Sequence, residues 1–187
     1  MNKIFNLPNC LTGARFLLAA VLACLMSLDQ TTMLAFISWF IFSIAAATDW
    51  VDGYVARLYK IETVLGKLMD PLADKVLVAT ALIMLIPLNV VPAWLALVIL
   101  CREMIITGLR GVAASSGIVV AASGLGKIKS IIQYISLGTL IFPEGILPIP
   151  YLHTIGLLLL YVALILTLWS GFDYFSKLKK VFFEASE

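Results

Sequence analysis

Residues 49–74 read DWVDGYVARLYKIETVLGKLMDPLAD, and this stretch connects two long apolar runs. It contains four carboxylates, Asp49, Asp52, Asp70 and Asp74. An aspartate at the centre of a membrane helix costs roughly 2.5–3.5 kcal/mol, so such a cluster needs compensation. The members of each pair are three or four residues apart and would share one face of a helix. Two such faces can converge into a site for divalent metal ions.

The composition indicates a protein embedded in a membrane. Hydrophobic residues make up 62% of the chain and charged residues 13%, and the mean hydropathy is +1.06. This leaves too little polar surface to cover a soluble globule. Uncharged runs at Gln30–Thr48, Val76–Cys101 and Gly145–Phe172 are long enough for helical spans. We expect an all-α integral membrane protein, with residues 1–187 forming a single domain.

The order of apolar runs and breakers predicts a six-transmembrane-helix bundle with a short N-terminal juxtamembrane segment. The N-terminus lacks the pattern of a cleavable signal, so we expect the first apolar run to be retained. The spans are predicted at Leu7–Leu28, Thr31–Arg57, Gly66–Ile86, from Pro92 to about Gly111, Leu125–Phe142 and Tyr151–Phe172.

The positions of the basic residues predict the orientation of the bundle. Every Lys and Arg except Arg102 falls at the N-terminus, in the second-to-third or fourth-to-fifth connection, or at the C-terminus. The opposite connections contain none. Because positive charge favours the cytoplasmic side, we expect a multi-pass protein of the cytoplasmic membrane. Its carboxylates and both termini should then face the cytoplasm.

The clustered carboxylates favour a metal site over two alternatives. Oxygen ligands prefer Mg²⁺ or Mn²⁺, and two such ions would balance four negative charges and suit phosphoryl displacement. The structural alternative is salt bridging with Arg57, Lys67 and Lys75. A cation transporter is the functional alternative, but it should place its acids near mid-membrane, at a repeat interface. Here they lie at one edge, and no repeat is visible.

The spacing Asp49-x-x-Asp52-Gly53-x-x-Ala56-Arg57, then eight residues to Gly66, then Asp70 and Asp74, resembles the signature of the CDP-alcohol phosphatidyltransferases. The resemblance implies a six-span membrane enzyme, often a homodimer, that transfers a phosphatidyl or similar group from a CDP-linked donor to an alcohol and releases CMP. It also implies a role in phospholipid biosynthesis among membrane lipids, with no nucleic-acid partner.

The same resemblance implies a role for each signature residue. Asp49, Asp52 and Asp70 match metal ligands, and Asp74 matches the proton acceptor, which can also touch a metal. Residues near the donor, CDP-diacylglycerol, would be Gly53, Ala56, Arg57, Thr63, Thr12 and Arg15. Alternatives stay open for some of them, since glycines are also common at membrane helix contacts and loop threonines commonly satisfy backbone groups.

The acceptor requires separate residues. Arg110, Lys127 and Lys129 are cations expected on the same face as the carboxylates, where they could bind a phosphate. Ordinary positive-inside signalling is the alternative. The stretches 102–110 and 126–130 resemble the branch of the family that uses glycerol 3-phosphate. Inositol phosphate or phosphatidylglycerol as acceptor is the alternative within the same chemistry.

Overall fold

The structure is a computed structural model that describes residues 7–59, 64–115 and 124–184, and the side chains of 12–48, 72–114 and 126–178. These described residues form six α-helices and no strands. The helices are α1 (Leu7–Met26), α2 (Thr32–Tyr59), α3 (Val64–Leu85), α4 (Ala93–Ser115), α5 (Gly124–Ile141) and α6 (Leu152–Glu184). The expected all-α fold is confirmed, and most predicted ends are within four residues of those observed.

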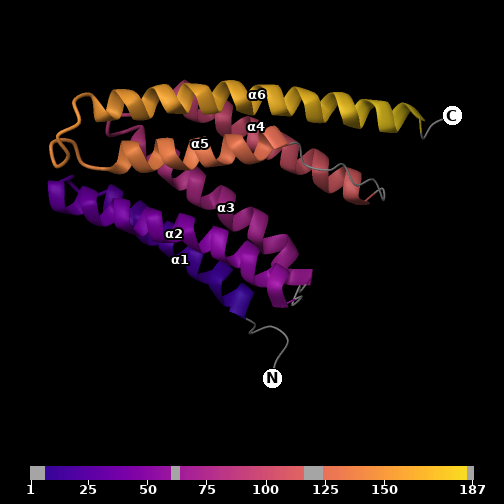
Figure 1. Cartoon of the computed structure of the whole chain (residues 1–187), viewed down its shortest axis with the longest axis horizontal. Coiled ribbons are helices and arrows are strands. Elements are labelled where there is room, and N and C mark those ends of the chain that lie inside the picture. Colours follow the sequence, from indigo (N-terminus) through magenta and orange to yellow (C-terminus); the bar gives the residue numbers. More distant parts are fainter. Residues whose placement is uncertain (1–6, 60–63, 116–123, 185–187) are drawn as a thin grey trace.

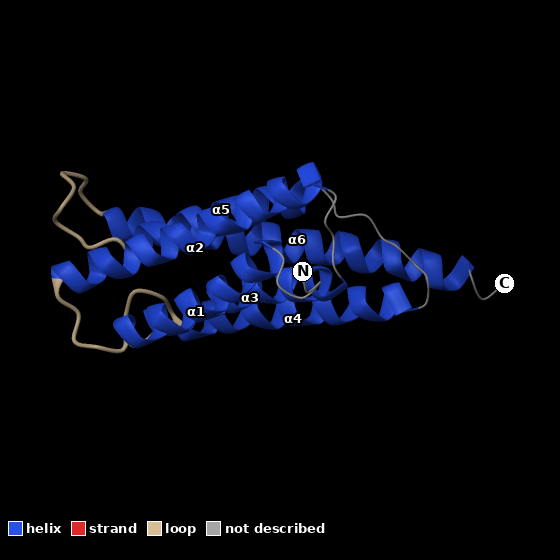
Figure 2. Ribbon diagram, turned by 90° about the horizontal axis from the view of Figure 1, so that it is seen from below, coloured by secondary structure: helices blue, strands red, loops and turns tan. Residues whose placement is uncertain are grey.

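The helices run up and down, so their connections alternate between two ends of the bundle. The connections at 27–31, 86–92 and 142–151 lie together at one end (Figure 2). The end of α2, the start of α3, the end of α4 and the start of α5 point toward the other end (Figure 1). The signature aspartates and the predicted acceptor cations therefore belong to the same end.

Helix α3 lies at the centre of this arrangement. It packs against α1, α2, α4 and α5, while α6 packs on α4 and α5. Its buried face, which includes Leu77, Ala81 and Leu82, belongs to the core shared with the other helices. Toward the end that carries the signature, α1 and α2 diverge from α6 (Figure 1). Helix α3 therefore crosses between the two groups of helices.

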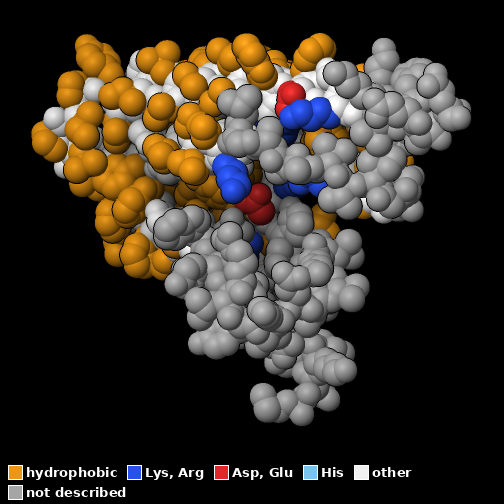
Figure 3. Space-filling view, turned by 45° about the vertical axis from the view of Figure 1, so that its right-hand side comes forward, with side chains coloured by type: hydrophobic (Ala, Val, Ile, Leu, Met, Phe, Trp, Pro, Cys, Tyr) orange, Lys and Arg blue, Asp and Glu red, His pale blue; other side chains and the backbone are white. Residues whose placement is uncertain are grey.

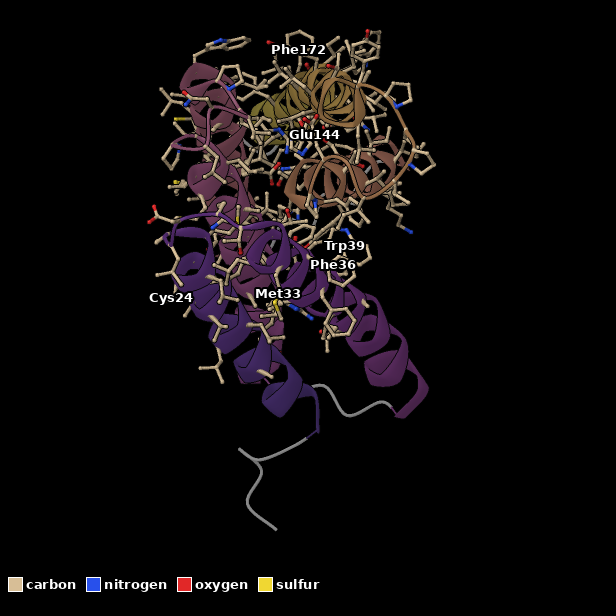
Figure 4. The ribbon with its side chains drawn as sticks, turned by 90° about the vertical axis from the view of Figure 1, so that its left-hand side faces the viewer. Cys24, Met33, Phe36, Trp39, Glu144 and Phe172 are labelled. Carbon is tan, nitrogen blue, oxygen red and sulfur yellow. The ribbon has the colours of Figure 1, made fainter. Side chains whose placement is uncertain are left out.

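The surface of the bundle is more apolar than that of a soluble protein. Large apolar residues are exposed on every helix, for example Leu17 and Phe172, which are 66% and 75% exposed. Cys24 and Phe172 point away from the bundle in Figure 4. The core is mainly apolar, but its buried positions also include Arg15, Lys129 and Gln133. Because lipid solvates apolar side chains and excludes charge, this pattern is typical of a bundle embedded in a membrane.

The length of the apolar segments supports this interpretation for α6. In the described part of the chain, only Leu152–Leu178 is long and apolar enough to cross a membrane by length and composition, with a mean hydropathy of 2.2. Thr12–Met26 and Thr32–Thr48 are apolar but shorter. Helix α4 carries Arg102, Glu103 and Arg110, which lowers its apolar character. Six spans therefore stay a prediction.

The last helix extends beyond its predicted membrane span. The span is predicted to end at Phe172, and α6 continues to Glu184. The apolar run stops at Asp173, and helical backbone continues beyond it. Lys177 Nζ lies 2.7 Å from Asp173 Oδ2, four residues earlier. Ion pairs between residues four apart stabilise a helix that continues beyond its apolar segment.

Candidate active site

Two neighbouring helices carry the signature residues. Asp49 and Asp52 lie in the second half of α2, together with Gly53, Ala56 and Arg57, and Asp70 and Asp74 lie in the first half of α3. The two helices pack against each other. Thr63 lies outside the described residues, as do the side chains of 49–71. The convergence of the four carboxylates therefore stays a prediction.

Asp74 is the signature carboxylate whose side chain the structure describes. It is partly buried and accepts a hydrogen bond at Oδ1 from the hydroxyl of Tyr134 on α5. This contact fixes one oxygen of the carboxylate. Asp74 also lies on the wall of a cavity between α3, α4 and α5.

This cavity, which we call the acceptor cavity after the role proposed for it below, is lined by both apolar and polar residues. The apolar residues are Val78, Ala79, Leu100 and Met104, and the charged or polar ones are Asp74, Lys75, Glu103, Lys129, Ser130, Gln133 and Tyr134. Figure 3 shows Lys, Arg, Asp and Glu side chains gathered in a hollow, beside a surface that is otherwise largely apolar. The cavity is small, with a volume of about 50 Å³, and it places these polar groups beside Asp74.

Glu103 organises the charges on one side of the acceptor cavity. Its Oε1 accepts from Arg102 Nη1 at 3.0 Å and from Lys129 Nζ. Arg102 also donates through Nη2 to Ser170 Oγ on α6, at 2.7 Å. Arg102 and Glu103, which are adjacent in the sequence, therefore serve each other as polar partners. The network ties α4 to α5 and α6 around the cavity.

The three predicted acceptor cations are placed differently. Lys129 is buried on the wall of the acceptor cavity. Arg110 is exposed near the end of α4, with its guanidinium carbon 5.7 Å from the centre of the Tyr174 ring. Lys127 is exposed on α5. Neither Arg110 nor Lys127 lines the cavity. Contact of these two with the acceptor therefore stays a prediction.

Among the predicted donor residues, Thr12 and Arg15 are both buried in the first half of α1. They are 2% and 0% exposed, and both make interactions within the bundle. Helix α1 packs along α2 and α3, the helices that carry the aspartates. A fully buried guanidinium near those helices is consistent with a role at an anionic donor, which stays a prediction.

Several cavity residues were not singled out from the sequence as site residues. Tyr134 and Gln133 follow Lys129 by one helical turn on α5, and Lys75 follows Asp74 directly. A polar pair within the apolar run of 131–142 was the available signal. This pair could be assigned to the site only once the packing of α5 against α3 was known.

The donor chemistry of the expected metal ligands fits Mg²⁺ or Mn²⁺, since all are carboxylates. Where the structure describes side chains, no group of three or more His, Cys, Asp or Glu is gathered. Asp74, the described member of the set, presents its carboxylate at the acceptor cavity on the helix that also carries Asp70. This is compatible with a hard cation nearby.

Comparison with known proteins identifies the family. The family model described as CDP-alcohol phosphatidyltransferase matches residues 5–169. The chain is 42% identical over 188 residues to the Bacillus subtilis (strain 168) protein named CDP-diacylglycerol–glycerol-3-phosphate 3-phosphatidyltransferase, covering 93% of this chain and 95% of the relative. The Rickettsia felis protein of the same name is 36% identical, with 95% and 97% covered.

A Mycobacterium tuberculosis (strain H37Rv) protein named probable phosphatidylglycerophosphate synthase is 35% identical, with 94% of this chain and 82% of the relative covered. The chain belongs to the CDP-alcohol phosphatidyltransferase family. It is a membrane-associated transferase of phospholipid biosynthesis.

Proposed function

We propose that this enzyme transfers the phosphatidyl group from CDP-diacylglycerol to glycerol 3-phosphate, giving phosphatidylglycerophosphate and CMP. The names of the relatives support both substrates. The observation that carries the proposal is the place of Asp74 on the wall of a cavity that also contains Lys129. A general base and a buried cation beside one cavity suit an alcohol that carries a phosphate.

In the proposed reaction, Asp74 takes the proton from the primary hydroxyl of the acceptor. The hydroxyl oxygen forms a bond to the phosphorus that carries diacylglycerol, and the bond from that phosphorus to CMP breaks. Tyr134 keeps the carboxylate of Asp74 directed by its hydrogen bond. Asp49, Asp52 and Asp70 would hold the metal. When bound, Mg²⁺ or Mn²⁺ would neutralise negative charge on the diphosphate of the donor.

The two substrates would reach this site from different phases. We expect the bundle end with the aspartates to face the cytoplasm, as the distribution of Lys and Arg in the sequence favours. Glycerol 3-phosphate is water-soluble and would enter from that side, whereas CDP-diacylglycerol would arrive within the membrane. A homodimer, two metal ions per site and six membrane spans are further parts of this proposal.

The test is an acceptor panel. Purified protein is incubated with CDP-diacylglycerol, Mg²⁺ and one of glycerol 3-phosphate, inositol phosphate or phosphatidylglycerol, and release of CMP is followed. Release with glycerol 3-phosphate is expected. If CMP is released with another acceptor but not with this one, the acceptor assignment is wrong.

A variant tests the role of the base in the same assay. Asp74→Asn should lower kcat by roughly 10²–10⁴-fold, the usual contribution of a general base. Asp173→Asn is the matched control, because Asp173 lies on α6 and pairs there with Lys177. If Asp74→Asn keeps full turnover, Asp74 is not the proton acceptor.

A further inference from the structure

Gln133 on α5 has a buried amide nitrogen that is unsatisfied within the part of the chain that the structure describes. The side chain is 3% exposed, and its Nε2 has no hydrogen-bond partner among the described residues. A buried donor without a partner is costly, and the great majority of buried polar groups are paired. The amide lies on the wall of the acceptor cavity, so a molecule bound there can supply the missing partner.

The neighbours of Gln133 define what that molecule must look like. Lys129 lies one helical turn earlier on the same face of α5, about 6 Å along the helix axis. Tyr134, the next residue, holds Asp74. Along α5 the cavity therefore presents a cation, then an amide, then the tyrosine that holds the proposed general base, Asp74 of α3. This order matches a molecule with a phosphate, a middle hydrogen-bonding group and a terminal hydroxyl.

We propose that Gln133 binds the secondary hydroxyl of the acceptor and selects glycerol 3-phosphate over alcohol phosphates that lack it. This inference rests on the proposed function and assigns a specificity residue to it. An amide suits this role because it can donate a hydrogen bond to a neutral hydroxyl without carrying a charge. In the cavity, the charges of Glu103 and Lys129 already neutralise each other. An acceptor without the hydroxyl would leave the amide buried and unpaired, which disfavours it.

The experiment compares two acceptors that differ at one position. Glycerol 3-phosphate and 3-hydroxypropyl phosphate share the phosphate and the primary hydroxyl, and only the first has the secondary hydroxyl. The wild-type enzyme should prefer glycerol 3-phosphate by roughly tenfold or more in kcat/KM. Gln133→Met keeps the length of the side chain and removes the amide. It should lower kcat/KM for glycerol 3-phosphate by the same factor and leave the value for the analogue unchanged.

The matched control is Ser136→Ala. Ser136 is buried on the same helix, but its hydroxyl donates to the Gly156 carbonyl oxygen on α6 at 2.7 Å, so it serves helix packing. This variant should keep the wild-type preference between the two acceptors, even if its thermal midpoint falls.

A second measurement separates recognition from folding. If the Gln133 amide only supported the fold, Gln133→Met would lower the thermal midpoint of the substrate-free enzyme. Under our proposal the midpoint stays equal or rises, because an unpaired buried donor is removed. An unchanged preference in Gln133→Met overturns the role of Gln133 and leaves the proposed function intact. Failure of the wild-type enzyme to use glycerol 3-phosphate overturns both.

Discussion

The hydroxyl of Tyr134 on α5 donates a hydrogen bond to Oδ1 of Asp74 on α3, joining residues 60 positions apart. The contact restricts the carboxylate that we propose as the general base. Tyr134→Phe removes the hydroxyl and keeps the ring. We expect kcat to fall roughly tenfold to a hundredfold, the loss of one hydrogen bond to a charged group. The KM for CDP-diacylglycerol should change little. Steady-state kinetics in mixed micelles measures both, and an unchanged kcat would argue against a positioning role.

The ion pairs of Glu103 predict a loss of stability. Glu103→Gln removes the negative charge and leaves Arg102 and Lys129 facing each other in a largely buried site. We expect the free energy of unfolding in detergent to fall by about 3 kcal/mol. Lys129→Met in the same chain should recover part of that loss. Asp173→Asn removes an exposed pair instead and should cost less than about 1 kcal/mol. Equal losses in Glu103→Gln and Asp173→Asn would contradict this account.

Gly156 lies where α6 packs tightly against side chains of α5. A Cβ placed there would lie 2.8 Å from Leu140 Cδ2 and 2.9 Å from Leu140 Cγ. Gly156→Ala should therefore cost about 1–3 kcal/mol through overpacking. Gly108→Ala on α4 is the control, since no atom lies within 4 Å of its added methyl group. It should be neutral or stabilising, because alanine is the better helix former. Thermal unfolding of the two variants compares them directly.

Chelation tests the metal expected from the carboxylates. Treatment with EDTA should abolish CMP release, and added Mg²⁺ or Mn²⁺ should restore it. Zn²⁺ should restore less, because an all-oxygen ligand set favours harder cations. Full activity after exhaustive chelation would remove the metal from the mechanism.

Arg110 tests how far the acceptor site extends beyond the cavity. Its guanidinium group lies over Tyr174, near the end of α4. If it reaches the acceptor phosphate, Arg110→Ala raises the KM for glycerol 3-phosphate roughly tenfold, the loss of one charge-assisted hydrogen bond, while kcat is kept. Lys127→Ala offers the same comparison at a second exposed cation. An unchanged KM in both variants would leave Lys129 as the cation of the acceptor site.

The positions of the helices could be predicted from the sequence because long apolar runs and their breakers are local features. The end of α6 could not be predicted in this way, because the helix continues through polar turns beyond its apolar run. The pairing of Arg102 with Glu103 was likewise accessible, because a buried charge requires a partner and the two are adjacent.

The cavity residues were harder to predict, for a physical reason. The proposed roles of Gln133 and Tyr134 come from the packing of α5 on α3, and a contact between distant parts of the chain leaves no trace in local periodicity. The aspartate spacing indicated the family because all four signature carboxylates lie within one short stretch. The cavity is assembled from three helices, so none of its residues stands out in the sequence.

The exposed apolar and buried polar surfaces also determine how unfolding can be observed. In lipid or detergent, each helix keeps its backbone hydrogen bonds even when it separates from its neighbours. Circular dichroism would therefore stay nearly constant while the bundle comes apart. A probe of helix contacts is needed, and Trp39 offers one, because its ring centre lies 5.2 Å from that of Phe142 and 5.6 Å from that of Phe36 (Figure 4). Its fluorescence should report dissociation of α2 from the 142–151 connection. Circular dichroism would not detect this event.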